Sequence, residues 1–124
     1  MKINKTIIVC DDDEGILEML AIILEDSGYN VIAEQNSLNL YKLIESKKPD
    51  LLLLDLWMPV LSGDQVLLHL RSQPETKTLP VIVLSASTDG PEIAFRAGAT
   101  DYIAKPFDID HLLSGIDGIL AVQS

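Results

Sequence analysis

The sequence predicts a doubly wound α/β fold, in which helices cover both faces of a five-stranded parallel sheet. Two apolar runs, residues 51–54 and 81–84, have the length of a strand and no alternation with polar residues. Such runs are typical of strands that are covered on both faces. Five strand-like runs alternate with five stretches of helical spacing, and the connections between them are short. This alternation indicates a parallel sheet with helices on both sides.

The first half of the chain predicts three strands and two helices. The strands are expected over residues 7–10, 30–33 and 51–54. Apolar residues with helical spacing follow the first strand, and this helix would begin at Asp12 or Asp13 and end at Gly28. Ser37 is expected to cap a second helix that ends before Pro49.

The second half predicts three helices and two strands. In order, these are a helix from Ser62, a strand over residues 81–84, a helix from Pro91 to Gly98, a strand over residues 102–104 and a helix from Asp108 or Asp110. Proline suits the first turn of a helix and glycine its end, so Pro91 and Gly98 bound a short fourth helix.

Length and composition favour one domain over residues 1–124, with a core from about residue 6 to residue 120. The formal net charge is −10, because 19 acidic residues face 9 lysines and arginines. Such a surface repels phosphate backbones and anionic lipid, so we expect no direct binding to nucleic acid or to a membrane. The acidic surface could equally serve solubility alone.

Cysteine use and the absence of long apolar segments point to a reduced, cytoplasmic protein. Cys10 is the only cysteine, so no intramolecular disulfide can form, and its place in an apolar run predicts a small buried side chain. No apolar stretch reaches membrane-spanning length, and the amino terminus shows no signal-peptide pattern.

Polar side chains stand at the carboxyl ends of four predicted strands. Asp11 and Asp12 follow the first strand, Asp55 the third, Ser85 the fourth and Lys105 the fifth. If the strand order is 2-1-3-4-5, the first and third strands are neighbours, separated by about 4.8 Å. Asp55 would then lie close to the acidic pair, at the edge of the sheet where such folds bind ligands.

A cluster of three carboxylates indicates either a shared proton or a bound cation. Carboxylates that close repel one another, and a hard divalent cation such as Mg²⁺ relieves the repulsion. A carboxylate nucleophile at Asp55 beside a cation, the Lys105 ammonium and the Ser85 hydroxyl suits phosphoryl transfer. The alternative is a solvated acidic rim with an unrelated surface lysine.

These residues carry a resemblance to a known family. The matching motifs are Asp11-Asp12, Asp55 with Met58-Pro59 and Ser62-Gly63, Ser85-Ala86, Ala97-Gly98-Ala99, and Asp101-Tyr102 leading to Lys105-Pro106-Phe107. In order and spacing they resemble the receiver domain of two-component response regulators, of the kind that acts in chemotaxis. The likeness covers almost the whole chain and implies a flavodoxin-like fold.

The resemblance implies that Asp55 is the phospho-acceptor, served by a histidine kinase or a histidine phosphotransfer protein. Asp12 and Asp55 would ligate Mg²⁺ directly, with Asp11 acting largely through water. The backbone carbonyl of Trp57 would complete the protein ligands, and Mn²⁺ is a possible substitute for Mg²⁺. Such a protein is not an enzyme beyond its own phosphorylation and dephosphorylation at Asp55.

The resemblance also implies a switch. Lys105 and Ser85 would each hold a phosphoryl oxygen, and the movement of Ser85 would make room for Tyr102 to rotate. The face made by the fourth helix, the fifth strand and the fifth helix would then change for a downstream target or output domain, or for a second copy in a weak dimer; a monomer is the alternative. Without the resemblance, Tyr102 is a fixed, half-buried aromatic residue. The Lys105-Pro106 bond would be cis.

Three features depart from the usual pattern of the family. Ser85 stands where threonine is commoner, Trp57 is bulky for its position, and the segment from Ser85 to Lys105 is about two residues short. The short segment leaves the length of the fourth helix open. Trp57 either shields the phosphoryl group from water or only covers the loop.

Two other functions are compatible with parts of the sequence. A small Mg²⁺-dependent phosphatase of the haloacid-dehalogenase type would use Asp11-x-Asp13, although Glu14-Gly15 follows where that motif wants threonine or valine. A receiver that binds partners and is never phosphorylated is the other, and the complete acidic set disfavours it.

Overall fold

The computed structural model describes residues 5–122 and has the predicted alternation of strands and helices. In chain order the elements are β1 (Thr6–Cys10), α1 (Glu14–Asp26), β2 (Asn30–Glu34), a 3-10 helix η1 (Ser37–Asn39), α2 (Leu40–Lys47), β3 (Leu51–Asp55), α3 (Gly63–Ser72), β4 (Val81–Ser85), α4 (Gly90–Ala97), β5 (Asp101–Ala104) and α5 (Ile109–Val122). The ends of the expected 1–124 domain, residues 1–4 and 123–124, lie outside the described residues. Among those described, no helix has both the length and the apolar character needed to span a membrane.

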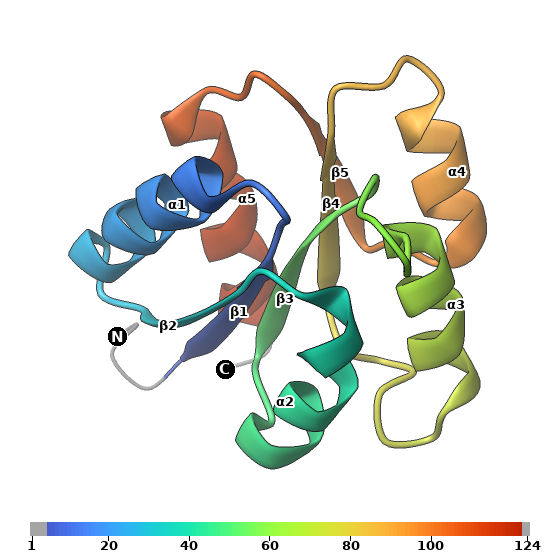
Figure 1. Cartoon of the computed structure of the whole chain (residues 1–124). Coiled ribbons are helices and arrows are strands. Elements are labelled where there is room, and N and C mark those ends of the chain that lie inside the picture. Colours follow the sequence, from blue (N-terminus) through green and yellow to red (C-terminus); the bar gives the residue numbers. More distant parts are fainter. Residues whose placement is uncertain (1–4, 123–124) are drawn as a thin grey trace.

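The five strands form one parallel sheet in the order β2-β1-β3-β4-β5, as the sequence predicted (Figure 1). In the register of the sheet Cys10 pairs with Leu54, and Asp55 pairs with Leu84. The carboxyl ends of β1, β3 and β4 therefore lie level with one another. This register brings Asp11, Asp55 and Ser85 to the same edge of the sheet.

Two apolar cores separate the sheet from its two layers of helices. On one face α2, α3 and α4 cover alternate residues of the strands, and on the other face α1 and α5 cover the remaining residues (Figure 1). The four leucines of β3 divide between these cores, with Leu52 and Leu54 on the first face and Leu51 and Leu53 on the second. All four are fully buried. Burial on both faces explains why the run lacks polar alternation.

Local sequence signals begin and end several helices as predicted. Of the two candidate caps for α1, Asp13 is the one used, since its carboxylate accepts a hydrogen bond from the Ile16 N–H at 3.1 Å. Pro91 occupies the first turn of α4, and Gly98 ends that helix with a φ of 106°. At α5 the Asp108 carbonyl accepts the first helical bond, from the Leu112 N–H.

The predicted cap of the second helix is wrong. Ser37 does not cap α2, which has no side-chain cap; Asn36 instead caps the preceding 3-10 helix, because its side chain accepts a hydrogen bond from the Leu38 N–H at 3.0 Å. A 3-10 turn then precedes α2, and Ser37 is buried within that turn. At its other end α2 stops on Lys48, which has a left-handed φ of 47°. Pro49 follows, and a residue before proline is disfavoured in the helical conformation.

Candidate functional site

The structure brings the predicted carboxylates of β1 and β3 together at the carboxyl edge of the sheet. Asp11, Asp12 and Asp55 each offer a carboxylate oxygen, and these oxygens all lie within 4.8 Å of one another. Asp11 and Asp55 are buried, whereas Asp12 is exposed. The adjacent Asp11 and Asp12 and the distant Asp55 therefore form one compact group of oxygen ligands.

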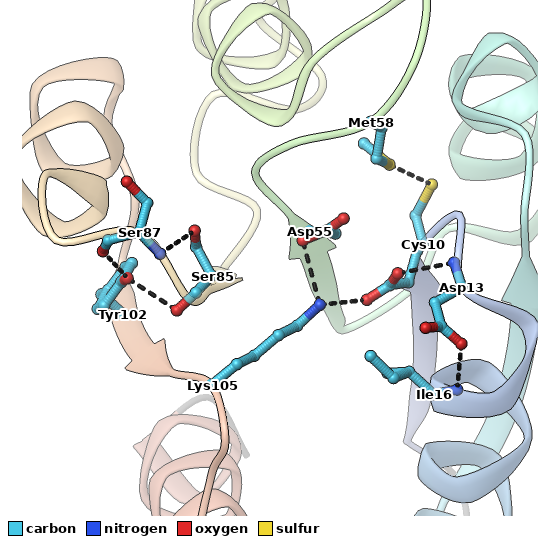
Figure 2. A network of polar contacts seen from close by, with 10 residues as sticks. Cys10, Asp13, Ile16, Asp55, Met58, Ser85, Ser87, Tyr102 and Lys105 are labelled. Atoms are coloured by element: carbon cyan, nitrogen blue, oxygen red, sulfur yellow. Dashed lines mark hydrogen bonds and ion pairs between the residues drawn. The ribbon is translucent and has the colours of Figure 1, made fainter.

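Lys105 enters this group from the end of β5. Its ammonium nitrogen lies 2.8 Å from Asp11 Oδ2 and 3.2 Å from Asp55 Oδ1, and Figure 2 shows its side chain reaching across to Asp55. The Lys105-Pro106 peptide bond is cis, as expected. One ammonium group faces three carboxylates, so the cluster retains an excess of negative charge.

This excess changes the proton affinity of the two central groups. Burial raises the pKa of Asp55 to about 6, and the charge of Asp11 adds to the rise, while Lys105 opposes it. For Lys105, burial acts to lower the pKa, but the hydrogen bond it donates to Asp11 and the charges of Asp11 and Asp55 outweigh burial, and the pKa is raised. Lys105 thus stays charged, and Asp55 is a carboxylate that gains from a further positive charge nearby.

Backbone contacts fix the loop that follows Asp55. The Gly63 N–H donates to the Leu56 carbonyl at 2.7 Å, and a Cβ at Gly63 would lie 2.4 Å from the Asp55 carbonyl oxygen. Only glycine allows α3 to begin this close to the end of β3. Within the loop, Val60 has a φ of 70° and the Leu61 N–H donates to the Pro59 carbonyl, which is a tight and strained turn.

Trp57 lies in this loop with 51% of its surface exposed. It is therefore available to solvent or to a partner beside the acidic group. The metal-binding role expected for its backbone carbonyl stays a prediction.

Ser85 ends β4 and is buried. Its Oγ accepts a hydrogen bond from the Ser87 N–H at 3.1 Å. A hydroxyl that accepts from a fixed N–H keeps its own O–H to donate to another oxygen. The backbone therefore fixes the Ser85 side chain at the same edge of the sheet as Asp55, and its role as a donor to a phosphoryl oxygen stays a prediction.

Tyr102 on β5 is half-buried and contacts the segment that follows Ser85. Its hydroxyl lies 3.0 Å from the Ser85 carbonyl oxygen and 3.3 Å from the Ser87 carbonyl oxygen, and Figure 2 shows the three residues grouped beside the acidic cluster. Tyr102 and Ser85 are thus in direct contact while Asp55 is unmodified, and the rotation of Tyr102 expected on phosphorylation stays a prediction.

Three contributors to the site did not emerge from the sequence. The Asp13 N–H donates to Asp11 Oδ1 at 2.9 Å, Gln35 Nε2 donates to the Asp12 carbonyl at 3.0 Å, and the Ser87 N–H holds Ser85. The Ser85–Ser87 spacing is that of a serine turn and could have been noticed. No pattern in the sequence pointed to Gln35, because its contact with the Asp12 carbonyl depends on the packing of β2 beside β1.

Cys10 is buried as predicted, and its Sγ lies 3.7 Å from Met58 Sδ. Burial raises the pKa of its thiol to about 12, and the charges of Glu34 and Asp11 contribute further. The thiol stays protonated at neutral pH, so it acts as a small apolar side chain beneath the acidic group.

Comparison with known proteins identifies the family. The model of the response regulator receiver domain matches residues 7–117. The phosphate regulon transcriptional regulatory protein PhoB of Pseudomonas aeruginosa is 35% identical over 120 residues, which cover 95% of this chain and 52% of PhoB. Protein PilH of the same organism is 33% identical over 93% of this chain and 97% of PilH. Several curated relatives are longer, and the chain spans about half of their length.

Solved structures agree with this assignment. A putative response regulator from Chloroflexus aurantiacus superposes with a TM-score of 0.90 and 34% identity, over 94% of this chain and 98% of that one. The chemotaxis protein CheY4 of Vibrio cholerae superposes with a TM-score of 0.85 and 25% identity, over 93% and 98%. The strand order of the sheet is that of the flavodoxin-like receiver fold.

The haloacid-dehalogenase alternative has no support in these findings. The matched residues run through the whole sheet and include Asp11, Asp55, Ser85 and Lys105. Asp13, which that alternative required as a catalytic residue, is instead the cap of α1. The chain therefore belongs to the response regulator receiver domain family of two-component phosphorelay signalling.

Proposed function

We propose that the protein accepts a phosphoryl group on Asp55, from a histidine kinase or a histidine phosphotransfer protein. The observation that carries this proposal is the Lys105 ammonium between Asp11 and Asp55, at 2.8 and 3.2 Å. A partly buried lysine in that position can neutralise a carboxylate before transfer and a phosphoryl oxygen after it. The transfer needs no substrate pocket of its own, because the donor protein presents the reactive group.

In the transfer, an oxygen of Asp55 attacks the phosphorus of a phosphohistidine. The new P–O bond replaces the P–N bond, and the released imidazole takes up a proton from solvent. Lys105 stabilises the negative charge on one phosphoryl oxygen, and the Ser85 hydroxyl donates a hydrogen bond to another. Hydrolysis of the acyl phosphate by water returns Asp55 to its original state, so the only catalytic events are self-phosphorylation and self-dephosphorylation.

The acidic cluster fits Mg²⁺, with Mn²⁺ as a possible substitute. All its ligand atoms are carboxylate oxygens, which both ions accept, and the charge excess left by Lys105 favours a divalent cation. As the family resemblance implies, Asp12 and Asp55 would bind the ion directly and Asp11 largely through water. The Trp57 carbonyl would complete the set. The ion would supply the charge that stabilises the transferred phosphoryl oxygens.

The phosphorylated protein would act through the face of α4, β5 and α5. A phosphoryl group adds about −1.5 to −2 charge beside Ser85, whose carbonyl already contacts Tyr102. A change at Ser85 thus reaches β5 and the adjoining helices, where a target, an output domain or a second copy in a weak dimer would bind. The net charge of −10 disfavours direct binding of this domain to nucleic acid or to a membrane. We also propose that the protein acts in the cytoplasm.

Tryptophan fluorescence tests the proposal, because Trp57 is the single tryptophan and lies two residues after Asp55. Titration with Mg²⁺ should change the emission, and subsequent beryllofluoride should change it again. The Asp55→Asn variant should lose the second response, whereas Asp26→Asn, which alters an exposed carboxylate of α1, should keep both. A beryllofluoride response that is undiminished in Asp55→Asn contradicts the assignment of the acceptor.

A further inference from the structure

Gly90 opens a space that Tyr102 fills. It is the first residue of α4 and is buried. A Cβ at this position would lie 2.5 Å from the Tyr102 hydroxyl oxygen, 2.9 Å from Cε1 and 3.0 Å from Cζ. Within residues 5–122 the glycines with positive φ are Gly28 and Gly98, so the backbone at Gly90 does not itself require glycine. The position of the Tyr102 ring is what excludes a side chain there.

Tyr102 cannot easily move aside, because its hydroxyl is held by the segment between β4 and α4. The carbonyl oxygens of Ser85 and Ser87 lie 3.0 and 3.3 Å from the hydroxyl oxygen. The Ser87 carbonyl also accepts a bond from the Gly90 N–H at 3.3 Å. Tyr102, Ser87 and Gly90 are thus linked in a small network that closes this segment over the tyrosine ring.

The same network determines the orientation of Ser85. The Ser87 N–H donates to Ser85 Oγ at 3.1 Å, so the peptide that follows Ala86 fixes the hydroxyl. Tyr102 binds the carbonyl groups on both sides of that peptide. Loss of the tyrosine contact would free the segment that holds the Ser85 hydroxyl toward the edge of the sheet.

We propose that Gly90 is a positioning residue for phosphoryl acceptance. By leaving space for Tyr102, it keeps the tyrosine bound to the segment from Ser85 to Gly90 while Asp55 is unmodified, and the bound tyrosine holds Ser85 ready to donate to a phosphoryl oxygen. The catalytic part of this inference rests on the proposed function at Asp55, whereas the docked position of Tyr102 does not.

The inference changes how the switch operates. Tyr102 does not wait for Ser85 to vacate a space, because the absence of a side chain at Gly90 already provides one. Phosphorylation would then strengthen an arrangement that the resting protein populates, and a smaller population shift would suffice to complete it.

The test compares Gly90→Ala with Gly118→Ala, a change in α5 where an added Cβ meets no atom of the described residues within 4 Å. NMR of protein labelled with ¹³C at tyrosine Cε reports on the rings in the unphosphorylated protein. The chain has three tyrosines, and the Tyr102 signal is identified as the one that disappears in Tyr102→Phe. The Tyr102 signal should move toward that of free tyrosine in Gly90→Ala and stay in place in Gly118→Ala. An unmoved signal in Gly90→Ala overturns the proposed space for Tyr102.

The rate of phosphorylation by acetyl phosphate with Mg²⁺ tests the role in catalysis. Gly90→Ala should slow the reaction about five-fold, the factor that corresponds to one net hydrogen bond. In a Tyr102→Ala background, which removes the clashing ring and keeps the variant able to fold, Gly90→Ala should cause no further loss. An equal loss in that background, or an unchanged rate in Gly90→Ala, overturns the inference. Phosphorylation of Asp55 in the wild-type protein is measured in the same assay. If the wild-type protein is not phosphorylated, the proposed function itself fails, and this result is distinct from a failure of the inference on Gly90.

Discussion

The ammonium nitrogen of Lys105 lies 2.8 Å from Asp11 Oδ2, although 94 positions separate the two residues in the sequence. The contact joins the end of β5 to the end of β1, and Asp55 on β3 lies between them at 3.2 Å from the same nitrogen. The sheet order explains this proximity, because parallel strands deliver their carboxyl ends to one edge. The central site of the receiver is therefore a product of topology and not of sequence distance.

Removal of the Lys105 charge should destabilise the metal-free protein. Lys105→Met keeps the apolar stem but leaves two buried carboxylates facing each other, and the expected loss in unfolding free energy at pH 7 is about 3 kcal/mol. Urea unfolding in EDTA measures it, with Lys42→Met on the exposed face of α2 as the control. Mg²⁺ should restore part of the loss. Equal stability of the two variants would contradict the proposed ion pairs.

The charge on Asp55 should make metal-free stability fall with rising pH. Its folded pKa of about 6 exceeds the ordinary value of 3.8, so the folded state binds the proton more tightly than the unfolded state. Its contribution to stability is therefore complete below about pH 4 and is lost as the pH rises through about 6. Asp55→Asn, which never ionises, should become the more stable protein above that range, by about 3 kcal/mol.

Urea unfolding in EDTA at several pH values between 4 and 8 measures the difference between wild type and Asp55→Asn. The control is Asp26→Asn, whose carboxylate is exposed at the end of α1. A stability gap that stays constant across this range would show that Asp55 titrates normally. Saturating Mg²⁺ should close the gap, since the wild-type carboxylate then has a counter-charge.

Gly63→Ala should disturb the loop that positions Asp55. The added Cβ would lie 2.4 Å from the Asp55 carbonyl oxygen and 2.9 Å from Leu56 Cα, so the backbone must shift. We expect a loss of about 2 kcal/mol in unfolding free energy, typical of overpacking, together with weaker Mg²⁺ binding by Trp57 fluorescence. The same change at Gly118, which has open space, provides the comparison. Wild-type Mg²⁺ affinity in Gly63→Ala would show that this contact does not position the site.

Trp57→Asn tests whether the exposed indole protects the phosphoryl group. If the ring limits the approach of water, the asparagine variant should lose its phosphoryl group several-fold faster than the wild type, as followed by intact-mass measurements after removal of the donor. Leu38→Asn changes another exposed apolar residue, located in η1, and should keep the wild-type lifetime. Equal lifetimes in all three proteins would remove the shielding role.

The sequence was sufficient to predict what depends on strand burial and strand order. Unbroken apolar runs identified β3 and β4, and the residues directly after the runs gave Asp55 and Ser85. The order 2-1-3-4-5 makes the first and third strands neighbours, which brings Asp55 close to Asp11, and it places Lys105 on the same edge. The contact itself depends on the reach of the lysine side chain. The residues that follow each apolar run can therefore be assigned to the site from the sequence, because all strands of a parallel sheet end at the same edge.

Features that depend on local turn geometry or on distant packing could not be predicted in the same way. Asn36 and Ser37 are both good caps, and the choice between them follows from a 3-10 turn that leaves no periodic signal. The docked position of Tyr102 depends on the free space at Gly90, twelve positions earlier, and a glycine at the start of a helix does not by itself indicate a tyrosine beside it. The sequence left the length of the fourth helix open, and in the structure α4 runs over Gly90–Ala97.

Intact mass after treatment with acetyl phosphate and Mg²⁺ tests the central claim most directly. The wild-type protein should gain the mass of one phosphoryl group, located on Asp55 by peptide mapping, and Asp55→Asn and EDTA-treated protein should gain none. A wild-type mass that never rises, or a gain that persists undiminished in Asp55→Asn, would contradict the account.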